Sequence, residues 1–411
     1  MKSVNGGGVK ISIQSFVMEG GERYCLLVDA GSGVPLFYPN LFITIQVRNK
    51  SLSFASMESA LSSISVLLKF CDERKIDLVE RLRAGVFFQL YEVDALADFC
   101  QFNLSSKVAA NKVLSLSKAR KPRVANETVY RRLSVIANYL DWLGSLLSVS
   151  GTENKNKLDA LVKKVRSRRP VKKGRNQSLV EKGLTDEQVD LLFEVFRPKS
   201  DMNPFKGEST KVRNRLMFLM LHFLGVRMGE LLSIKVKDID FSNNQIVIAR
   251  RADEKADPRL DQPLVKTMDR RIPLKDSLAA EIHNYVINYR RKESSARKHE
   301  YLFVVHKPGP TSGQPVSKAT YNKVMTTVKA LSPKLIDFTG HALRHKWNER
   351  FSLLMDSMDE PPDEAKQEQL RSWLMGWKQG SGTAAYYNQR FIRRKAEGAA
   401  LLLQDKIMTR G

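Results

Sequence analysis

Cysteine is scarce in this sequence, and long apolar runs are missing altogether. Only three cysteines occur among 411 residues, and Cys25, Cys71 and Cys100 lack the short spacing of zinc ligands. They support neither a disulfide framework nor a metal site, and they fit a reducing cytosol. No apolar run approaches the roughly 20 residues that span a bilayer. Because Met1 to Gly8 is also polar and unlike a secretory signal, we expect a cytoplasmic protein without a membrane partner.

Acidic residues are also in short supply compared with basic ones. The chain carries 68 Lys and Arg against 44 Asp and Glu, which gives a formal net charge of +24 and a pI near 9.9. Such an excess favours a polyanionic partner, and nucleic acid is the commonest one. The sequence shows neither a P-loop nor a carboxylate cluster, so we expect no nucleotide, metal or other cofactor.

Four segments differ in their residue patterns. Residues 1–50 alternate like strands between glycine turns, which predicts a short N-terminal β element that braces the next domain, with an independent DNA-binding module as the alternative. Residues 51–150 follow a helical period and predict a helical domain with a basic rim, whereas residues 151–183 carry a basic run typical of an interdomain linker. Residues 184–411 combine helices with a few strands. The expected fold class is therefore mainly α (α+β), with a mostly helical last domain that contains a small antiparallel sheet.

Hydrophobic periodicity places the individual elements. Helices are expected from Phe54 to Cys71 and over residues 93–102, 126–146, 186–195, 208–224, 276–292, 318–330, 340–355, 365–375 and 383–404. Strands are expected around residues 9–13, 24–28, 41–47, 245–249, 263–265 and 271–274. Thr185 and Gln188 predict a capping box at the start of the last domain. The acidic segment 355–368 is expected to be a surface loop, and a subunit contact is the alternative.

Two groups of basic residues are candidates for DNA contact. One lies in the acid-free stretch between Lys107 and Val124, and the other lies in the predicted linker. Cations in such segments bind phosphates and add salt-sensitive affinity without reading the base sequence. The candidate DNA-binding residues are Lys118, Arg120, Lys121, Arg123, Arg166, Arg168, Arg169, Lys172 and Lys173.

Arg227 follows a glycine break and stands at the start of a predicted helix, with Glu230 one turn later. An arginine at a helix N-terminus is electrostatically unfavourable for the helix itself. The position makes sense if the five guanidinium donors are kept for an anion and Glu230 restrains the side chain. Taken alone, the same two residues would form an ordinary surface ion pair.

Further candidates for chemistry lie in the last domain. Lys266 stands on a predicted β-hairpin, from which a flexible amine can protonate a leaving oxygen. His341 and Arg344 are three residues apart and share a helix face, and Trp377 follows a glycine. Each also has an ordinary interpretation when taken singly: a surface lysine, a core histidine or a core tryptophan. Together with a tyrosine further on, they could surround a phosphodiester without any metal.

Taken together and in this order, Arg227, Lys266, His341-x-x-Arg344, Trp377 and a terminal tyrosine resemble the catalytic set of the tyrosine recombinases, the phage-type integrases and their relatives. The resemblance implies that a tyrosine attacks the scissile phosphate, giving a 3′-phosphotyrosyl enzyme and a free 5′-hydroxyl without metal or ATP. It implies that Arg227 and Arg344 clamp the non-bridging oxygens, where negative charge develops. His341 would transfer a proton near the nucleophile, Lys266 would protonate the departing 5′-oxygen, and Trp377 would bind and pack.

Two adjacent tyrosines are candidates for the nucleophile. Tyr386 stands nine residues after Trp377, the commoner spacing in the family, and Tyr387 stands ten residues after it. However, Gly380-Ser381-Gly382 resembles a lengthened turn, and the stretch from Asn388 to Phe391 resembles the residues after the nucleophile in relatives with the longer spacing. We therefore choose Tyr387 and keep Tyr386 as the alternative. On a helix the two side chains point about 100° apart, so only one can be in line with the phosphate.

The resemblance also implies the partners. Residues 51–150 would correspond to the family's core-binding domain, and the substrate would be double-stranded DNA carrying recombination sites of a mobile genetic element. The chain would bind as a dimer at each site and as a tetramer on two duplexes, with accessory DNA-bending or element-encoded proteins. An amphipathic segment, 396–408, would dock on the neighbouring subunit. Alternatives are a type IB topoisomerase that relaxes DNA as a monomer, and a catalytically silent DNA-binding protein.

Overall fold

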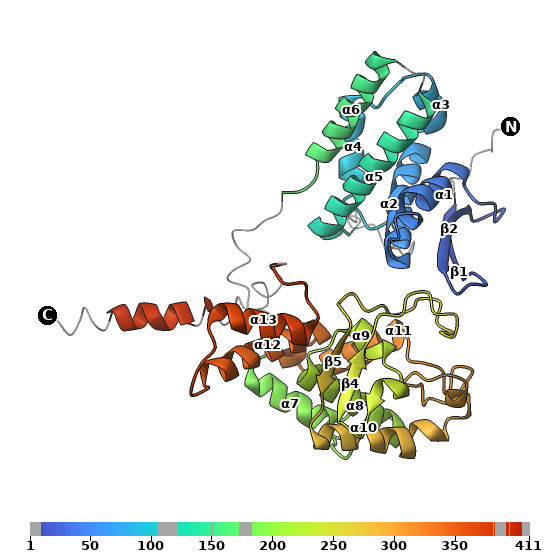
Figure 1. Ribbon diagram of the computed structural model, residues 1–411. Coiled ribbons are helices and arrows are strands. Elements are labelled where there is room, and N and C mark those ends of the chain that lie inside the picture. Colours follow the sequence, from blue (N-terminus) through green and yellow to red (C-terminus); the bar gives the residue numbers. More distant parts are fainter. Residues whose placement is uncertain are drawn as a thin grey trace, which may run out of the picture. The chain divides into compact units, whose positions relative to one another are not determined.

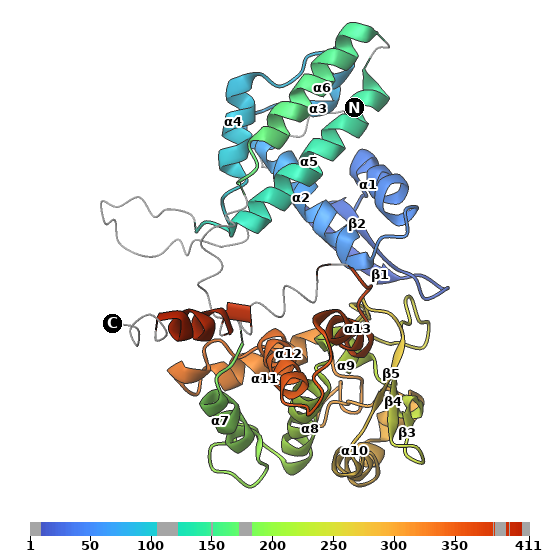
Figure 2. The ribbon, with the colours of Figure 1, turned by 60° about the vertical axis from the view of Figure 1, so that its left-hand side comes forward.

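The computed structural model divides the chain into two compact units. The first contains Met1–Met18 and Arg23–Lys173, and the second contains Glu19–Glu22 and Gly174–Gly411. Both are mainly helical, and each has one small antiparallel sheet within its described residues, as the sequence predicted (Figures 1 and 2). The described residues are 10–104, 122–148, 151–171, 183–380, 382, 392–393 and 395–404.

The first unit starts with two paired strands and continues as helices. Its elements are β1 (Ile11–Val17), β2 (Arg23–Asp29), α1 (Phe37–Ile43), a π-helical turn (Thr44–Arg48), α2 (Phe54–Glu73), α3 (Leu78–Arg83), α4 (Leu90–Phe99), α5 (Asn126–Leu147) and α6 (Thr152–Ser167). In the antiparallel pair, Ile11 lies opposite Asp29. One hydrophobic core includes residues from β2, α2, α5 and α6, so the strands belong to the same packed unit as the helices.

Helix α2 contributes much of this core. By length and composition it is the one helix among the described residues that could cross a membrane. Its apolar side chains are used in the core, where Leu61, Ile64 and Leu67 are buried against the rest of the unit and α5 packs beside them. A core helix of this kind passes the same test as a membrane span.

Residues 41–47 differ from the sequence prediction. They were expected to form a strand, but they lie in α1 and in the π-helical turn after it. A short apolar run has no period long enough to separate a strand from a buried helix. The packing decides the outcome here: the ring of Phe42 meets Tyr139 and Trp142 of α5 edge-on, with centroids 5.3 and 5.4 Å apart.

The first half of the predicted linker also differs from expectation. Residues 152–167 form α6, which packs against α5 and buries one apolar face made of Leu158, Leu161, Val162 and Val165. Three of the basic residues that suggested a solvated linker, Lys163, Lys164 and Arg166, lie on the exposed side of this helix. The spacing of the four buried residues was the helical signal, and the charge pattern obscured it. The division into four domains stays a prediction.

The second unit is arranged around α8. Its elements are α7 (Asp186–Phe196), α8 (Glu208–Leu224), α9 (Met228–Ser233), β3 (Ile239–Asp240), β4 (Gln245–Ile248), β5 (Arg270–Pro273), α10 (Asp276–Asn288), α11 (Lys318–Lys329), α12 (Gly340–Asp356) and α13 (Glu364–Met375), with short 3-10 turns at Val236–Asp238, Arg290–Lys292, Ser294–Lys298 and Pro333–Leu335. Helix α8 contacts α7, α9, α10 and α12, as Figure 1 lets the reader follow. The sheet has the order β3-β4-β5, with Ile246 opposite both Ile239 and Ile272.

Local interactions explain where the predicted elements of this unit hold and where they fail. The capping box is confirmed, since Thr185 Oγ1 accepts from the Gln188 amide and Gln188 Oε1 accepts from the Thr185 amide. Residues 263–265 are not a strand, because Ser233 Oγ donates to the Pro263 carbonyl oxygen (2.8 Å), in place of a strand partner. The acidic segment 355–368 is the end of α12, a turn and the start of α13.

Candidate active site

Arg227 is held at the junction between two helices. Gly225 ends α8 in the left-handed conformation (φ +60°), and Arg227 is the N-cap residue of α9. A Cβ at Gly225 would lie 2.9 Å from Met375 Cε and from Trp347 Cγ, so glycine permits the close approach of α8 to α12 and to the end of α13. The guanidinium of Arg227 remains partly exposed, with 23 % of its side chain accessible.

Glu230 is the buried centre of a cluster of arginines. Its carboxylate accepts hydrogen bonds from Arg270 Nη2 (2.8 Å), Thr267 Oγ1 (2.7 Å) and the Arg227 amide (3.1 Å). Two further guanidinium nitrogens lie close: Arg227 Nη1 at 3.6 Å and Arg344 Nη1 at 3.9 Å. Burial raises the pKa of Glu230, but the charges of Arg270 and Arg344 and the hydrogen bonds outweigh this, so the net pKa is lowered and the carboxylate is ionised.

Three guanidinium groups around one carboxylate leave an excess of positive charge. We call Arg227, Glu230, Arg270 and Arg344 the arginine cluster. A single carboxylate compensates one of the three cations, and the rest is available to an anion that approaches from the open side of Arg227. The arrangement therefore fits a doubly charged or strongly polarised oxyanion.

Arg344 is completely buried and is oriented mainly by main-chain carbonyls. Its Nη1 donates to the Gly225 carbonyl oxygen (2.5 Å) and its Nη2 donates to the Met375 carbonyl oxygen (3.2 Å). The guanidinium carbon lies 5.2 Å from the centre of the Trp377 ring, within cation–π range. Because neutral carbonyls fix the group, its orientation is set without cancelling its charge.

Trp377 follows Gly376, the glycine that ends α13 and contacts the residues just before β5. Gly376 ends α13 at φ +64°, and a Cβ there would lie 2.8 Å from Arg270 Nη1 and from the Met268 carbonyl oxygen. The Met268 amide donates to the Gly376 carbonyl oxygen (3.0 Å), and Arg270 Nε donates to the Leu374 carbonyl oxygen (2.6 Å). The β4–β5 connection and the end of α13 are thereby joined at the arginine cluster.

Lys266 lies on that connection, four residues before β5, with its side chain exposed. The next residue, Thr267, donates to Glu230 Oε1, and the preceding residue, Val265, is buried. The backbone on both sides of Lys266 is therefore anchored beside the cluster while its amine is in solvent. A flexible amine in this position can reach an oxygen bound at the cluster.

His341 lies in the first turn of α12, next to Thr339, whose Oγ1 caps the helix by accepting from the Ala342 amide (2.9 Å). Its imidazole is exposed to solvent at one side. Desolvation, together with the positive charges of Arg227 and Arg344, lowers the pKa of His341 below its ordinary value. At neutral pH the ring is therefore uncharged and able to accept a proton.

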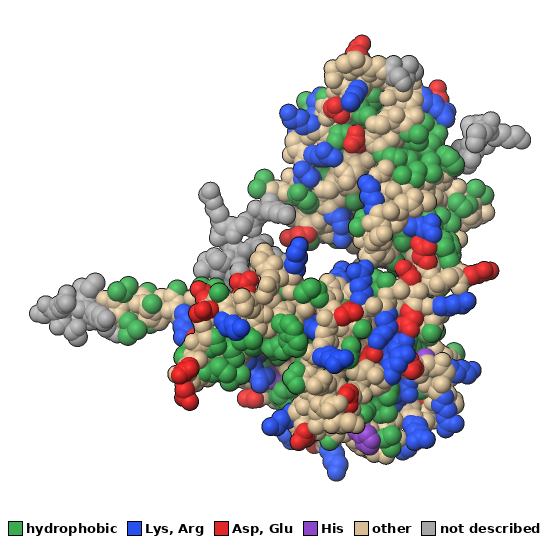
Figure 3. All heavy atoms as spheres, in the orientation of Figure 1, with side chains coloured by type: hydrophobic (Ala, Val, Ile, Leu, Met, Phe, Trp, Pro, Cys, Tyr) green, Lys and Arg blue, Asp and Glu red, His purple; other side chains and the backbone are tan. Residues whose placement is uncertain are grey.

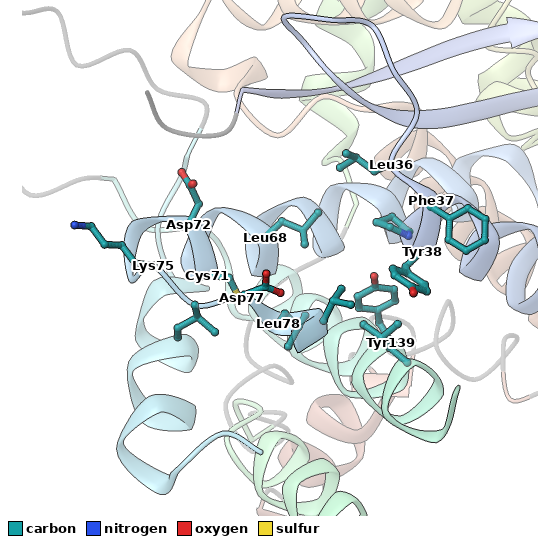
Figure 4. Close-up of a pocket in the computed structure, with 14 residues that line it drawn as sticks. Leu36, Phe37, Tyr38, Leu68, Cys71, Asp72, Lys75, Asp77, Leu78 and Tyr139 are labelled. Carbon is teal, nitrogen blue, oxygen red and sulfur yellow. The ribbon is translucent and has the colours of Figure 1, made fainter. Parts of the chain in front are cut away.

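A cavity of about 330 Å³ opens beside these residues. Its described lining contains cations and no carboxylate: Arg227, Met228, Tyr321, Asn322, Met325, Thr326, Lys329, Thr339, Gly340, His341 and Arg344. A larger cavity of about 740 Å³ lies in the first unit between α1, α2, α3 and α5, and Figure 4 shows its mostly apolar walls. The larger cavity contains none of the predicted catalytic residues, so size does not identify the site.

The structure brings together Arg227, Glu230, Arg344 and Trp377 and places Lys266 and His341 at the edge of the same group. Tyr386 and Tyr387, together with Lys118, Arg120, Lys121, Lys172 and Lys173, lie outside the described residues. Among the described residues, no group of three or more His, Cys, Asp or Glu side chains could hold a metal ion.

The four described candidates for DNA contact all lie in the first unit. Arg123 is exposed, and Arg166 Nη2 donates to Asn138 Oδ1 (2.9 Å). The other two interact within the unit. Arg168 Nε forms an ion pair with Asp94 Oδ1 (2.5 Å), and Arg169 Cζ lies 4.8 Å from the centre of the Tyr130 ring. A role in DNA binding stays a prediction for all four.

Arg270 and Thr267 were missed by the sequence reasoning. They are separated from Glu230 by about 40 positions along the chain, and only the antiparallel β4–β5 pairing brings them to it. The available signal was weak. Arg270 follows Lys266 closely in a strand pattern whose alternate residues point inward, and an arginine at an inward position requires a buried acidic partner.

Comparison with known proteins gives consistent matches. The phage integrase family matches residues 182–392, about half of the chain. Transposase A from transposon Tn554 of Staphylococcus aureus is 25% identical over 298 residues, which cover 70% of this chain and 75% of that protein. Tyrosine recombinase XerA of Pyrococcus furiosus is 30% identical over 167 residues, covering 40% of this chain and 46% of that protein.

Two solved structures illustrate the structural matches. One is the XerH site-specific recombinase bound to a palindromic difH substrate, with 17% identity, coverage of 89% of this chain and 94% of that chain, and a TM-score of 0.43. The other is the Tn1549 transposon integrase in complex with transposon right end DNA, with 14% identity, coverage of 73% and 80%, and a TM-score of 0.42.

Proposed function

This chain belongs to the phage integrase family and is a tyrosine recombinase, an enzyme that breaks and rejoins DNA, and we propose that it does so through a covalent 3′-phosphotyrosyl intermediate. The observation that carries this proposal is the arginine cluster beside a neutral histidine. A phosphodiester needs cationic donors for its non-bridging oxygens and a base near the attacking hydroxyl, and both are present. The chemistry requires no metal and no ATP, since the phosphotyrosyl ester conserves the energy of the broken bond.

Arg227 and Arg344 would bind the two non-bridging oxygens of the scissile phosphate. Negative charge grows on these oxygens as the tyrosine oxygen attacks, so donors that are already oriented stabilise the transition state more than the bound substrate. Arg344 meets this requirement, because two main-chain carbonyls hold it in place before DNA arrives. Glu230 and Arg270 would act indirectly by keeping Arg227 and the β4–β5 connection in position.

His341 and Lys266 would handle the protons. The lowered pKa of His341 leaves an unprotonated ring nitrogen that can accept the tyrosine proton as the phosphate ester forms. Lys266 would donate a proton to the departing 5′-oxygen, and the same group would take it back when that hydroxyl attacks the phosphotyrosine. The indole N–H of Trp377 can donate a hydrogen bond but cannot transfer a proton. Trp377 would therefore pack against Arg344 and help to bind the substrate.

Tyr387 is our choice for the nucleophile, with Tyr386 as the alternative. The longer spacing is supported by the sequence Gly380-Ser381-Gly382, which resembles a lengthened turn, and both glycines have positive φ (+70° and +67°), which glycine adopts readily. Both tyrosines lie outside the described residues, and the choice of Tyr387 rests on the sequence pattern.

A nicked suicide duplex tests the reaction and the nucleophile together. Covalent protein–DNA adduct is expected with the wild type and with Tyr386→Phe, and no adduct is expected with Tyr387→Phe. Sequencing the trapped DNA ends then identifies the site and the polarity of cleavage. Adduct formation by Tyr387→Phe would transfer the role to Tyr386. Relaxation of supercoiled DNA by the monomer without site preference would favour the topoisomerase alternative.

Assembly into a dimer at each site and a tetramer on two sites is the second part of the proposal. The described C-terminal helical residues 395–404 expose three leucines, Leu401, Leu402 and Leu403, each more than 60 % accessible. In the second unit, α12 and α13 also expose apolar side chains, namely Leu353, Leu354, Leu370 and Trp373, and Figure 3 shows green side chains gathered on this unit. We propose that residues 395–404 of one subunit dock on this surface of the next.

Deletion of the residues after Ala396 tests this contact. DNA binding by the truncated monomer is expected to stay unchanged, while the higher-order complexes seen with two duplexes weaken. Trp373→Ser should reproduce the defect from the acceptor side. Unchanged synapsis in both variants would count against the contact.

A further inference from the structure

Tyr321 of α11 carries a buried hydroxyl that has no hydrogen-bond partner among the described residues. The residue is only 4 % exposed, and it lines the 330 Å³ cavity together with Arg227, His341 and Arg344. The other buried phenols that the structure describes in this unit have hydrogen-bond partners. The hydroxyl of Tyr285, for example, contacts His306 Nε2 (3.1 Å) and accepts from the Val304 amide (3.3 Å). An unpaired buried hydroxyl is destabilising, so its presence at this one place requires an explanation.

The hydroxyl lies against the N-terminus of α12. A Cβ built on Gly340, the first residue of that helix, would be 2.3 Å from the Tyr321 oxygen, so only glycine leaves room for the phenol here. The first turn of a helix has main-chain N–H groups without intrahelical acceptors, and Thr339 Oγ1 satisfies the one on Ala342. The phenol thus meets the positive end of a 17-residue helix.

The other charges around the cavity are also suited to an anion. Arg227, Arg344 and Lys329 supply cations, His341 is neutral, and the described lining contains no carboxylate. A phenol can donate to a phosphate oxygen, and burial raises the pKa of Tyr321, so it stays protonated and acts as a donor. The cavity therefore contains a built set of donors, and the Tyr321 hydroxyl among them has no acceptor within the described residues.

We propose that the Tyr321 hydroxyl donates a hydrogen bond to a phosphate of the DNA backbone that occupies this cavity. Tyr321 is then a substrate-binding residue outside the arginine, lysine, histidine and tryptophan set found from the sequence. The inference rests on the proposed function for the identity of the anion as a DNA phosphate. It rests on the geometry alone for the existence of the anion site.

Tyr321→Phe is the direct test, because it removes one oxygen and keeps the ring. In the free protein its Tm is expected to equal or exceed that of the wild type, since a buried unpaired donor is lost. Tyr285→Phe is the matched control: it removes a partnered phenol and should lower the Tm without affecting phosphate binding. A fall in Tm for Tyr321→Phe would show that the hydroxyl has a structural partner and would overturn the proposal.

Single-turnover cleavage of the nicked duplex measures the contact with DNA. Loss of a hydrogen bond to a charged group corresponds to a decrease on the order of 10-fold to 100-fold. A slower cleavage rate at saturating DNA with unchanged Kd assigns the bond to the scissile phosphate. A weaker Kd with an unchanged saturating rate assigns it to a neighbouring phosphate.

Inorganic phosphate separates this proposal from the proposed function. At constant ionic strength set with chloride, phosphate is expected to raise the Tm of the wild type and of Tyr285→Phe more than that of Tyr321→Phe. This arm does not depend on DNA cleavage, so a wild type that forms no covalent adduct would refute the recombinase chemistry and leave the anion site to be judged here. The proposal would be overturned if Tyr321→Phe equalled the wild type in all three measurements: the rise in Tm with phosphate, the Kd for DNA and the single-turnover cleavage rate.

Discussion

The Glu230→Gln substitution is expected to lower the stability of the second unit strongly, although glutamine has nearly the same shape as the buried glutamate that it replaces. The carboxylate lies 2.8, 3.6 and 3.9 Å from nitrogens of Arg270, Arg227 and Arg344. At an effective dielectric constant of about 20, a unit pair at such distances is worth about 4–6 kcal/mol before desolvation is subtracted. The amide leaves three guanidinium groups facing one another with no anion between them.

The net loss is smaller than the Coulomb sum, because an ionised Glu230 also carries the cost of its own burial. Removing one partner of a buried ion pair typically costs about 3–5 kcal/mol. For a unit of this size that corresponds to a fall in Tm of about 6–20 °C, which scanning calorimetry or circular dichroism measures. Because the pKa of Glu230 is lowered, the stability that the ionised carboxylate contributes is present above pH 4.5 and is lost as the pH falls further. The stability of Glu230→Gln should therefore depend less on pH in the acid range.

Two further variants make the test decisive. Glu194→Gln removes a more exposed carboxylate that pairs with Arg197 at 2.8 Å, and it should cost at most about 1 kcal/mol. Arg227→Ala removes one of the like charges from the cluster, so stability should stay the same or rise while the cleavage rate falls on the order of 10²–10³-fold. If Glu230→Gln changes the Tm no more than Glu194→Gln does, the carboxylate is not the electrostatic centre of the cluster and the reasoning is refuted.

Three shorter predictions concern histidines and the helix start. Burial and the nearby charges of Arg350 and Lys346 lower the pKa of His222 to about 4. The protein should therefore lose about 3 kcal/mol of stability as the pH falls from 6.5 to 4, because the unfolded chain takes up a proton that the folded protein does not. His222→Phe should flatten that part of a curve of Tm against pH. The lowered pKa of His341 places the acid limb of the single-turnover cleavage rate below pH 6.5, and a limb at or above 6.5 would contradict its role as a neutral base. Gly340→Ala should lower the Tm by overpacking, and adding Tyr321→Phe should restore part of the loss, which a double-mutant cycle quantifies.

Some parts of this site could be predicted from the sequence because they depend on neighbours along the chain. His341 and Arg344 share a face of one helix, and Arg227 and Glu230 are related by one capping turn. A helical period and a cap are local properties, so the residue spacing carries them. The long helices of both units were predictable for the same reason, with α5 and α8 close to their expected bounds.

Other parts depend on contacts between distant segments and leave no local pattern. The bond from Arg270 to Glu230 needs the β4–β5 pairing, and the approach of Tyr321 to Gly340 needs α11 to pack across the start of α12. The strand expected over residues 41–47 failed because a short, largely apolar run fits either a strand or a buried helix, and the packing of Phe42 against α5 distinguishes the two.

The way in which Arg344 is buried explains how the site can be oriented before DNA binds. A guanidinium paired directly with a carboxylate would be stable but electrically neutral, and an incoming phosphate would have to compete with that partner. Arg344 donates instead to two carbonyl oxygens, and the nearest carboxylate, Glu230, is 3.9 Å away and makes its shortest bonds with Arg270 and Thr267. The cost of this arrangement is lower stability of the free protein, offset by the packing of α8, α12 and the Trp377 ring around the cluster. In the proposed complex a bound phosphate would supply the missing negative charge, so DNA binding should itself raise the Tm of the second unit.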